Sequence, residues 1–137
     1  VNTLLLDKAL LAKGVSPVEA LYGDNTDGQG LINHIKRLGW PLNGARVAII
    51  GAGGAARGVV LPLIEAGIIE LTIANRTLSK ATELVNELSI ASTAIADKQI
   101  KTFATAALSG VFDIIINATS IGLSGKTLPL ADALNCQ

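Results

Sequence analysis

The stretch Val47-Ala48-Ile49-Ile50-Gly51-Ala52-Gly53-Gly54-Ala55-Ala56 decides the fold of this chain. Its first four residues form a continuous apolar run, which is typical of a parallel strand buried on both faces. Gly51, Gly53 and Ala56 then occupy the marked positions of the pattern G-x-G-x-x-G/A. Gly51 permits a tight turn, Gly53 lets a ligand approach the backbone, and Ala56 lets a helix pack closely on the strand. The stretch therefore predicts a strand, a glycine-rich turn and a helix that bind the pyrophosphate of a dinucleotide.

Strands and helices are predicted to alternate from Ala45 onward. The predicted strands cover residues 47–50, 68–74, 90–96 and 112–117, and the predicted helices cover 54–66, 79–88 and 101–108. Pro62 lies inside the first of these helices and should kink it. Alternation of this kind implies right-handed crossovers and a parallel sheet. We therefore predict an α/β domain with a Rossmann-like, doubly wound parallel sheet, followed by a tail over 123–137 with little periodicity.

The residues before this domain follow a different pattern. Residues 1–6 read as a strand, and residues 10–17 as a loop or irregular hairpin because Gly and Pro interrupt them. A turn cluster over 23–28 precedes apolar residues at helical spacing, with Thr26 or Asp27 available as the N-cap. The chain begins at Val1 and contains no Met, so we expect it to be a piece of a longer protein whose upstream domain is missing.

The second predicted strand ends in a cationic segment. A site for NAD usually carries Asp or Glu about 20 residues beyond the glycine turn, but Glu70 comes too early for this role. Arg76 occupies that neighbourhood instead, with Thr77, Ser79 and Lys80 close by. A guanidinium pairs with a phosphate through two hydrogen bonds, whereas a carboxylate would repel it. The segment therefore predicts NADP(H), which carries a 2′-phosphate, as the cofactor.

Further motifs occur in a fixed order along the chain. They are Val1-Asn2-Thr3-Leu4, Asn25-Thr26-Asp27-Gly28, the glycine turn continued through Arg57-Gly58, Asn75-Arg76-Thr77 and Ile116-Asn117-Ala118-Thr119-Ser120. Over nearly the whole chain, these motifs resemble the shikimate dehydrogenase family of the aromatic amino acid pathway. The resemblance implies an oxidoreductase that reduces 3-dehydroshikimate to shikimate with NADPH.

The resemblance also implies roles for individual residues. Asn2 and Asp27 are expected to contact the substrate hydroxyls, and Asp27 is expected to be the partner of a catalytic lysine. The glycine turn would hold the pyrophosphate, the Asn-Arg-Thr segment the 2′-phosphate, and the Asn-Ala-Thr-Ser segment would lie near the nicotinamide ribose. The expected cofactor-binding residues are Gly51, Ala52, Gly53, Gly54, Ala55, Asn75, Arg76, Thr77, Ser79, Lys80, Asn117, Thr119 and Ser120.

The chain departs from the family pattern at both ends. The family's Ser-x-Ser segment, its catalytic lysine in Asn-Val-Thr-x-Pro-x-Lys, and the region completing the nicotinamide side do not occur. We therefore interpret residues 1–26 as a remnant of the substrate-binding domain and hinge. Residues 27–137 are interpreted as an NADP-binding Rossmann-type domain, incomplete at its C-terminal end. Because ketone reduction needs a proton donor as well as a hydride, the chain alone is expected to be inactive.

Composition excludes several other classes of protein. Eleven basic and 11 acidic residues give no electrostatic footprint for nucleic acid, and 3% aromatic residues disfavour base stacking. A single cysteine, Cys136, excludes an intrachain disulfide, and His34 has no partner at metal-ligand spacing. Neither a membrane span nor a signal peptide is found in the sequence. We expect a cytoplasmic monomer or homodimer that binds a small-molecule substrate, with no nucleic-acid, membrane or metal partner.

Alternative functions stay open at this point. A quinate/shikimate dehydrogenase would accept NAD or NADP, although Arg76 without a nearby carboxylate disfavours it. A non-catalytic NADP-binding module would fit the absence of the lysine segment if the chain is complete. A methyltransferase with a similar glycine turn would need an acidic residue after the second strand, where Asn75 and Arg76 stand instead.

Overall fold

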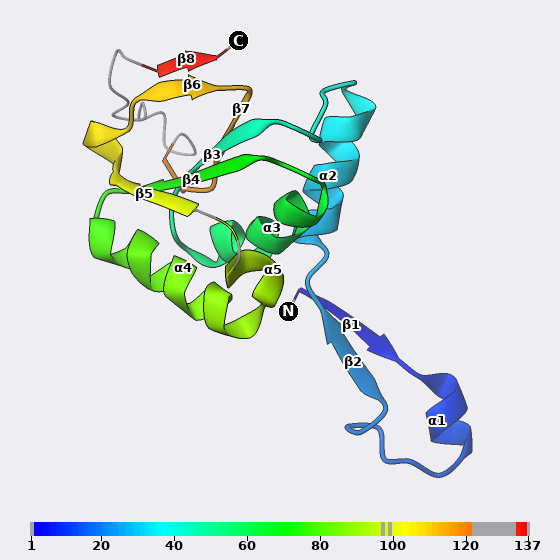
Figure 1. Ribbon diagram of the computed structural model, residues 1–137. Helices are drawn as coiled ribbons and strands as arrows, with labels where there is room; N and C mark the ends of the chain where they lie inside the picture. The colour runs from blue at the N-terminus through cyan, green and yellow to red at the C-terminus, as the bar shows by residue number, and fades with distance from the viewer. Residues whose placement is uncertain (1, 97, 99, 122–133, 137) are drawn as a thin grey trace.

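The computed structural model describes residues 2–96, 98, 100–121 and 134–136 and is built around a parallel sheet (Figure 1). The sheet has the strand order β5-β4-β3-β7, and the strands span Arg46–Ile50 (β3), Glu70–Asn75 (β4), Ile100–Ala104 (β5) and Ile114–Asn117 (β7). Each neighbouring pair is parallel. Ile50 lies opposite Ala74 of β4 and Asn117 of β7, so the carboxyl ends of these three strands meet at one edge.

Helices cover one face of the sheet. They span Asp27–Arg37 (α2), Gly54–Glu65 (α3), Leu78–Ala91 (α4) and Thr93–Ala96 (α5). Val47 and Ile49 of β3 belong to the large core cluster, together with apolar residues of these helices. Ala48 and Ile50 alternate with them and join a smaller cluster with Leu108 on the other face. β3 is therefore buried on both faces, and the predicted Rossmann-like parallel sheet is confirmed.

The chain crosses the second face of the sheet between β5 and β7. It passes through the 3-10 helix η1 (Thr105–Ala107) and strand β6 (Gly110–Phe112), which pairs in parallel with β8 (Leu134–Cys136). In Figure 1, β6 and β8 lie on one side of the sheet, and α3, α4 and α5 lie on the other. Most of the tail predicted over 123–137 falls outside the described residues.

A hairpin precedes the sheet and projects away from it (Figure 1). β1 (Thr3–Leu6) pairs antiparallel with β2 (Leu21–Asp24), and α1 (Lys8–Ala12) lies between them. α1 begins where Oδ1 of Asp7 accepts hydrogen bonds from the backbone amides of Ala9 and Leu10. The predicted N-terminal strand is confirmed over 3–6. The loop predicted from residue 10 was wrong at its start, because the chain is helical through Ala12.

Two predicted elements between β4 and β7 were wrong. Residues 90–96 form no strand, because α4 continues to Ala91 and, after the extended Ser92, α5 buries Ile95 in the core. Residues 101–108 are not an α-helix, because Ile100–Ala104 forms β5 and extends the sheet beside β4. Nζ of Lys101 lies 3.0 Å from Oε1 of Glu70 across that pair. Pairing with a distant strand therefore decided the conformation of this segment.

The strand predicted over 112–117 is divided at Asp113. The backbone N–H of Asp113 donates to the carbonyl of Arg46 at 2.9 Å, and Oδ2 of Asp113 accepts from the amide of Arg46 at 2.7 Å. These two bonds join the amino end of β7 to the amino end of β3. β6 therefore ends at Phe112, and only β7 enters the central sheet.

Candidate functional site

Gly51 begins the turn that leads from β3 to α3. Its φ is 113°, in the left-handed region that favours glycine. Its N–H donates to the carbonyl of Ala74 at 2.7 Å. A Cβ at this position would lie 2.8 Å from the carbonyl oxygen of Ala118, just beyond β7. Both the backbone angle and this close approach therefore require glycine.

Gly53 and Gly54 leave the start of α3 open. Gly53 is the N-cap residue and supplies no side-chain hydrogen bond, so the amides of the first turn lack a side-chain cap. A Cβ on Gly53 or Gly54 would meet no described atom within 4 Å, and both residues and Ala55 are exposed. Open amides at the positive end of a helix dipole attract an anion. This geometry fits the pyrophosphate predicted at Gly51 to Ala55.

A cavity of about 350 Å³ lies at the carboxyl ends of the strands. It is lined by Ile50, Asn75, Arg76, Thr77, Lys80, Ala104, Thr105, Ala106, Thr119, Ser120 and Ile121. Arg76 and Lys80 make the described lining cationic, since no acidic residue belongs to it. Nδ2 of Asn75 donates to the carbonyl of Thr77 at 2.8 Å and orders the turn after β4. The cavity thus combines a cationic wall with the edge that carries the glycine turn.

The cavity also contains residues that the sequence analysis missed. Thr105 and Ala106 line it because η1 follows β5 at the same edge of the sheet, and Thr105 is buried. The signal would have been a strand over 100–104, whose carboxyl end must lie beside that of β4, but a helix was predicted there. Ser79 and Asn117 were predicted to bind the cofactor, and neither is among the residues that line this cavity.

Asn117 instead organises the segment that follows β7. Its Oδ1 accepts hydrogen bonds from the backbone N–H of Thr119 at 3.0 Å and from the hydroxyl of Thr119 at 2.7 Å. Its Nδ2 donates to the carbonyl of Ile121 at 3.0 Å, and the amide of Ile121 donates to Oγ1 of Thr119 at 3.1 Å. These bonds hold Thr119 and Ser120 at the cavity wall.

Asn2 and Asp27 meet where the hairpin joins α2. Nδ2 of Asn2 donates to Oδ1 of Asp27 at 2.6 Å and to Oδ1 of Asn25 at 3.3 Å. Oδ1 of Asn2 accepts from the amide of Thr26 at 3.0 Å, and the amide of Asp27 donates to Oδ1 of Asn25 at 3.1 Å. All four residues are exposed, so the two predicted substrate ligands lie together in a polar cluster open to solvent.

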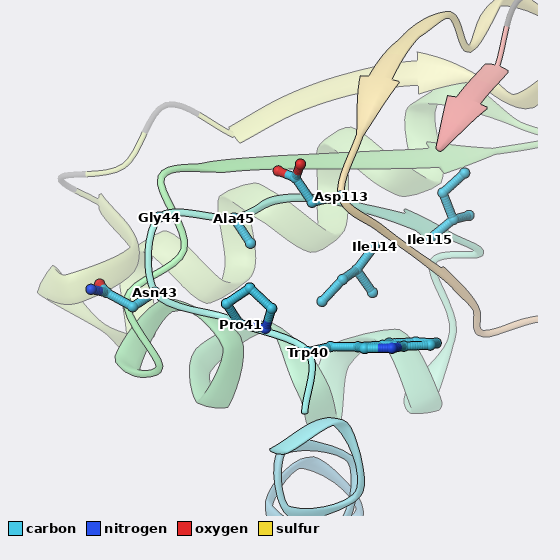
Figure 2. Close-up of a pocket in the computed structure, with 8 residues that line it drawn as sticks. All are labelled: Trp40, Pro41, Asn43, Gly44, Ala45, Asp113, Ile114 and Ile115. Atoms are coloured by element: carbon cyan, nitrogen blue, oxygen red, sulfur yellow. The ribbon is translucent and has the colours of Figure 1, made fainter. Parts of the chain in front are cut away.

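Another cavity, of about 610 Å³, lies at the amino ends of the strands, opposite the cationic cavity (Figure 2). Its lining consists of Trp40, Pro41, Asn43, Gly44, Ala45, Asp113, Ile114 and Ile115. These residues precede β3 or lie at the start of β7, so this second cavity is at the amino ends of the strands. Hydrogen bonds from the backbone amide of Arg46 and from its guanidinium hold the pKa of Asp113 below its ordinary value. Asp113 is therefore engaged in an ion pair, and no predicted site residue lines this second cavity.

Two kinds of feature are absent from the described part of the chain. Within it, no group of three or more His, Cys, Asp or Glu side chains is arranged to hold a metal ion. No helix there combines the length and the apolar character needed to cross a membrane.

Known proteins share the sequence and the fold of this chain. The family model described as "Shikimate / quinate 5-dehydrogenase" matches residues 34–123. The curated "Shikimate dehydrogenase (NADP(+))" of Psychrobacter arcticus is 81% identical over 137 residues, which make up 100% of this chain and 48% of that protein. The chain therefore spans about half the length of the curated relatives that it matches.

Solved structures show the same arrangement of strands and helices. Shikimate 5-dehydrogenase from Listeria monocytogenes, in complex with shikimate and NAD, has a TM-score of 0.68 at 27% identity and covers 96% of this chain and 45% of its own. The Thermus thermophilus enzyme, in complex with NADP(H) and shikimate, has a TM-score of 0.59 at 32% identity and covers 76% of this chain and 35% of its own. Because the family model spans both the glycine turn and the Asn-Arg-Thr segment, the chain belongs to the shikimate / quinate 5-dehydrogenase family.

Proposed function

We propose that this chain is the NADP-binding portion of an enzyme that reduces 3-dehydroshikimate to shikimate. The observation that carries the proposal is the cavity at the carboxyl ends of the strands, where Arg76 and Lys80 stand with no described acidic neighbour in the lining. A 2′-phosphate is favoured by such a wall, whereas the ribose hydroxyls of NAD are usually held by a carboxylate. The relative that is 81% identical is named as an NADP(+) enzyme, which supports this choice.

The glycine turn would hold the middle of the cofactor, and the segments after β4 and β7 would hold its two ends. Residues from Gly51 to Ala55 would bind the pyrophosphate through backbone amides, because no side chain fills the space above Gly53 and Gly54. The segment after β4 would bind the adenosine 2′-phosphate through Asn75, Arg76 and Thr77, with Ser79 and Lys80 close by. The segment after β7 would lie at the nicotinamide ribose through Asn117, Thr119 and Ser120. NADPH, when bound, supplies the hydride.

Asp27 and Asn2 would bind the substrate and take part in the transfer of a proton. Asn2 donates to one carboxylate oxygen of Asp27 and so orients the carboxylate. We propose that Asp27 pairs with a lysine from a segment that this chain does not contain, and that this pair delivers the proton to the carbonyl oxygen. On this proposal, residues 1–26 are the remnant of a substrate-binding domain and hinge, and residues 27–137 belong to the NADP domain.

The first test is a calorimetric titration of the chain with NADP⁺, NAD⁺ and shikimate. We expect weak binding of NADP⁺, weaker binding of NAD⁺ and almost no binding of shikimate, because only part of the substrate site is present. Equal binding of both dinucleotides would contradict the role of the cationic wall. No binding of either would contradict the role of the glycine turn.

The second test uses a hybrid enzyme in which residues 1–137 replace the matching part of the Psychrobacter arcticus relative. We expect the hybrid to oxidise shikimate with NADP⁺ and the 137-residue chain alone to show negligible activity. An inactive but folded hybrid would favour a non-catalytic NADP-binding module. Because the family description also names quinate, quinate serves as the competing substrate, and a preference for it would favour the quinate/shikimate alternative.

A further inference from the structure

Helices α2 and α3 pack against each other (Figure 1). Gly28 of α2 has no room for a side chain at this contact. A Cβ on Gly28 of α2 would lie 2.5 Å from Cγ of Pro62 and would also collide with the carbonyl oxygen of Gly58. Pro62 has no N–H, so α3 continues through it without a hydrogen bond to the Gly58 carbonyl, its partner four residues earlier. That carbonyl therefore faces α2, and Gly28 lets the two helices approach.

Asn25 occupies the space next to Gly58. A Cβ on Gly58 would lie 2.7 Å from Nδ2 of Asn25, closer than real Cβ contacts allow. Oδ1 of the same side chain accepts from the amide of Asp27 at 3.1 Å and from Nδ2 of Asn2 at 3.3 Å. One face of Asn25 thus rests on α3, while its oxygen holds the two residues proposed to bind substrate.

Gly58 and the glycine turn belong to the same rigid element. α3 begins at Gly54, and Gly58 follows four residues later, which is about 6 Å along a helix axis. The pyrophosphate site at the start of α3 and the surface on which Asn25 rests therefore move together. Asn25 therefore links the backbone of Asp27 to the helix at whose start the proposed cofactor site lies.

We propose that Asn25 and Gly58 are positioning residues, which set the distance between the Asp27 carboxylate and the glycine turn. This inference rests on the proposed function, in which Asp27 binds substrate and the turn binds NADP. Reduction of a ketone requires the carbonyl carbon to lie close to the hydride donor while its oxygen lies close to the proton donor. A misplacement of about 1 Å can lower a rate by about 100-fold.

The test compares Gly58→Ala with Gly30→Ala in the hybrid enzyme. Both substitutions add one methyl group to a helix, but a Cβ on Gly30 would meet no described atom within 4 Å. We expect Gly58→Ala to lower kcat for shikimate by about 10- to 100-fold, as a displaced reacting group does, while the Kd for NADP⁺ stays unchanged. Gly30→Ala should leave both quantities unchanged.

A double-mutant cycle distinguishes positioning from loss of stability. Asn25→Ala removes the atom that the new methyl group would strike, so Gly58→Ala should lower kcat much less in an Asn25→Ala background than alone. Equal losses in both backgrounds, or a loss of NADP⁺ binding that parallels the loss of kcat, would overturn the inference. If the unmodified hybrid is inactive, the proposed function fails instead. A crystal structure of the Gly58→Ala chain then tests the positioning role by itself. A displacement of Asp27 relative to the glycine turn would support that role, and an unchanged position would overturn it.

Discussion

Asn2 and Asp27, separated by 25 positions in the sequence, are joined by a hydrogen bond of 2.6 Å from Nδ2 to Oδ1. Oδ1 of Asn2 is also occupied, because it accepts hydrogen bonds from the backbone amide and the hydroxyl of Thr26. The side-chain amide of Asn2 therefore joins the start of β1 to the start of α2 and engages one oxygen of the Asp27 carboxylate. Because this carboxylate is proposed to bind substrate and to take part in proton transfer, the first substitution removes its charge.

Asp27→Asn should abolish most activity of the hybrid enzyme without changing its affinity for NADP⁺. General acid–base groups contribute about 10²- to 10⁴-fold, so we expect kcat/KM for shikimate to fall by at least about 100-fold. The Kd for NADP⁺ should be unchanged, because Asp27 lies outside the cavity at the strand ends. Steady-state kinetics and calorimetry measure the two effects. The control is Glu83→Gln, an exposed carboxylate on α4, and a similar loss in both variants would contradict the assignment.

Arg76→Asp should change the preference between the two dinucleotides. Losing a charged hydrogen bond to the 2′-phosphate costs about 1.5–3 kcal/mol, or roughly 10- to 150-fold in the Kd for NADP⁺. Affinity for NAD⁺ should be retained or improved, because the new carboxylate can accept from the ribose hydroxyls. Competitive titration with both dinucleotides measures the ratio. The control is Lys98→Asp, which makes the same charge change just before β5, at the amino ends of the strands. It should leave the ratio of the two Kd values unchanged.

Gly51→Ala and Gly53→Ala should separate stability from binding. Gly51→Ala should lower the free energy of unfolding by about 1–3 kcal/mol, because a side chain is strained in the left-handed backbone conformation. The collision with the carbonyl of Ala118 adds to this loss. At Gly53, the backbone is extended and the added methyl group meets no described atom, so the loss is below about 1 kcal/mol. The Kd for NADP⁺ should nevertheless rise in Gly53→Ala. Denaturant unfolding and calorimetry test both, and equal stability of the two variants would refute this distinction.

The ion pair between Asp113 and Arg46 should make the stability of the fold depend on pH. Its pKa is lowered in the folded state by the backbone amide and the guanidinium of Arg46, so its contribution is present above the unfolded pKa of about 3.9. That contribution is lost as the pH falls through the folded pKa. We expect Asp113→Asn to be less stable than the unmodified chain at pH 7, and the difference between them to shrink below about pH 4. Urea unfolding at several pH values measures this, and a constant difference would contradict it.

The glycine turn shows which part of the fold could be read from the sequence. Four apolar residues, a turn that tolerates no side chain at Gly51 and a helix opening at Gly54 are consecutive in the chain, so local pattern was sufficient. The identity of β5 shows the opposite case. Residues 100–104 have no pattern that excludes a helix, and they became a strand because β4 offers an edge with which they pair. Thr105 was missed at the cavity for the same reason.

The sequence by itself determined the central strand, the glycine turn and the cationic end of β4, because each depends on the spacing of neighbouring residues and on the charge of their side chains. Only the tertiary structure decided that the chain resumes as helix α5 after Ser92, that residues 100–104 pair with β4, and that Asn25 rests on Gly58. These features depend on how closely two distant segments approach. That distance is set by the packing of the helices on the sheet, and no local pattern contains it.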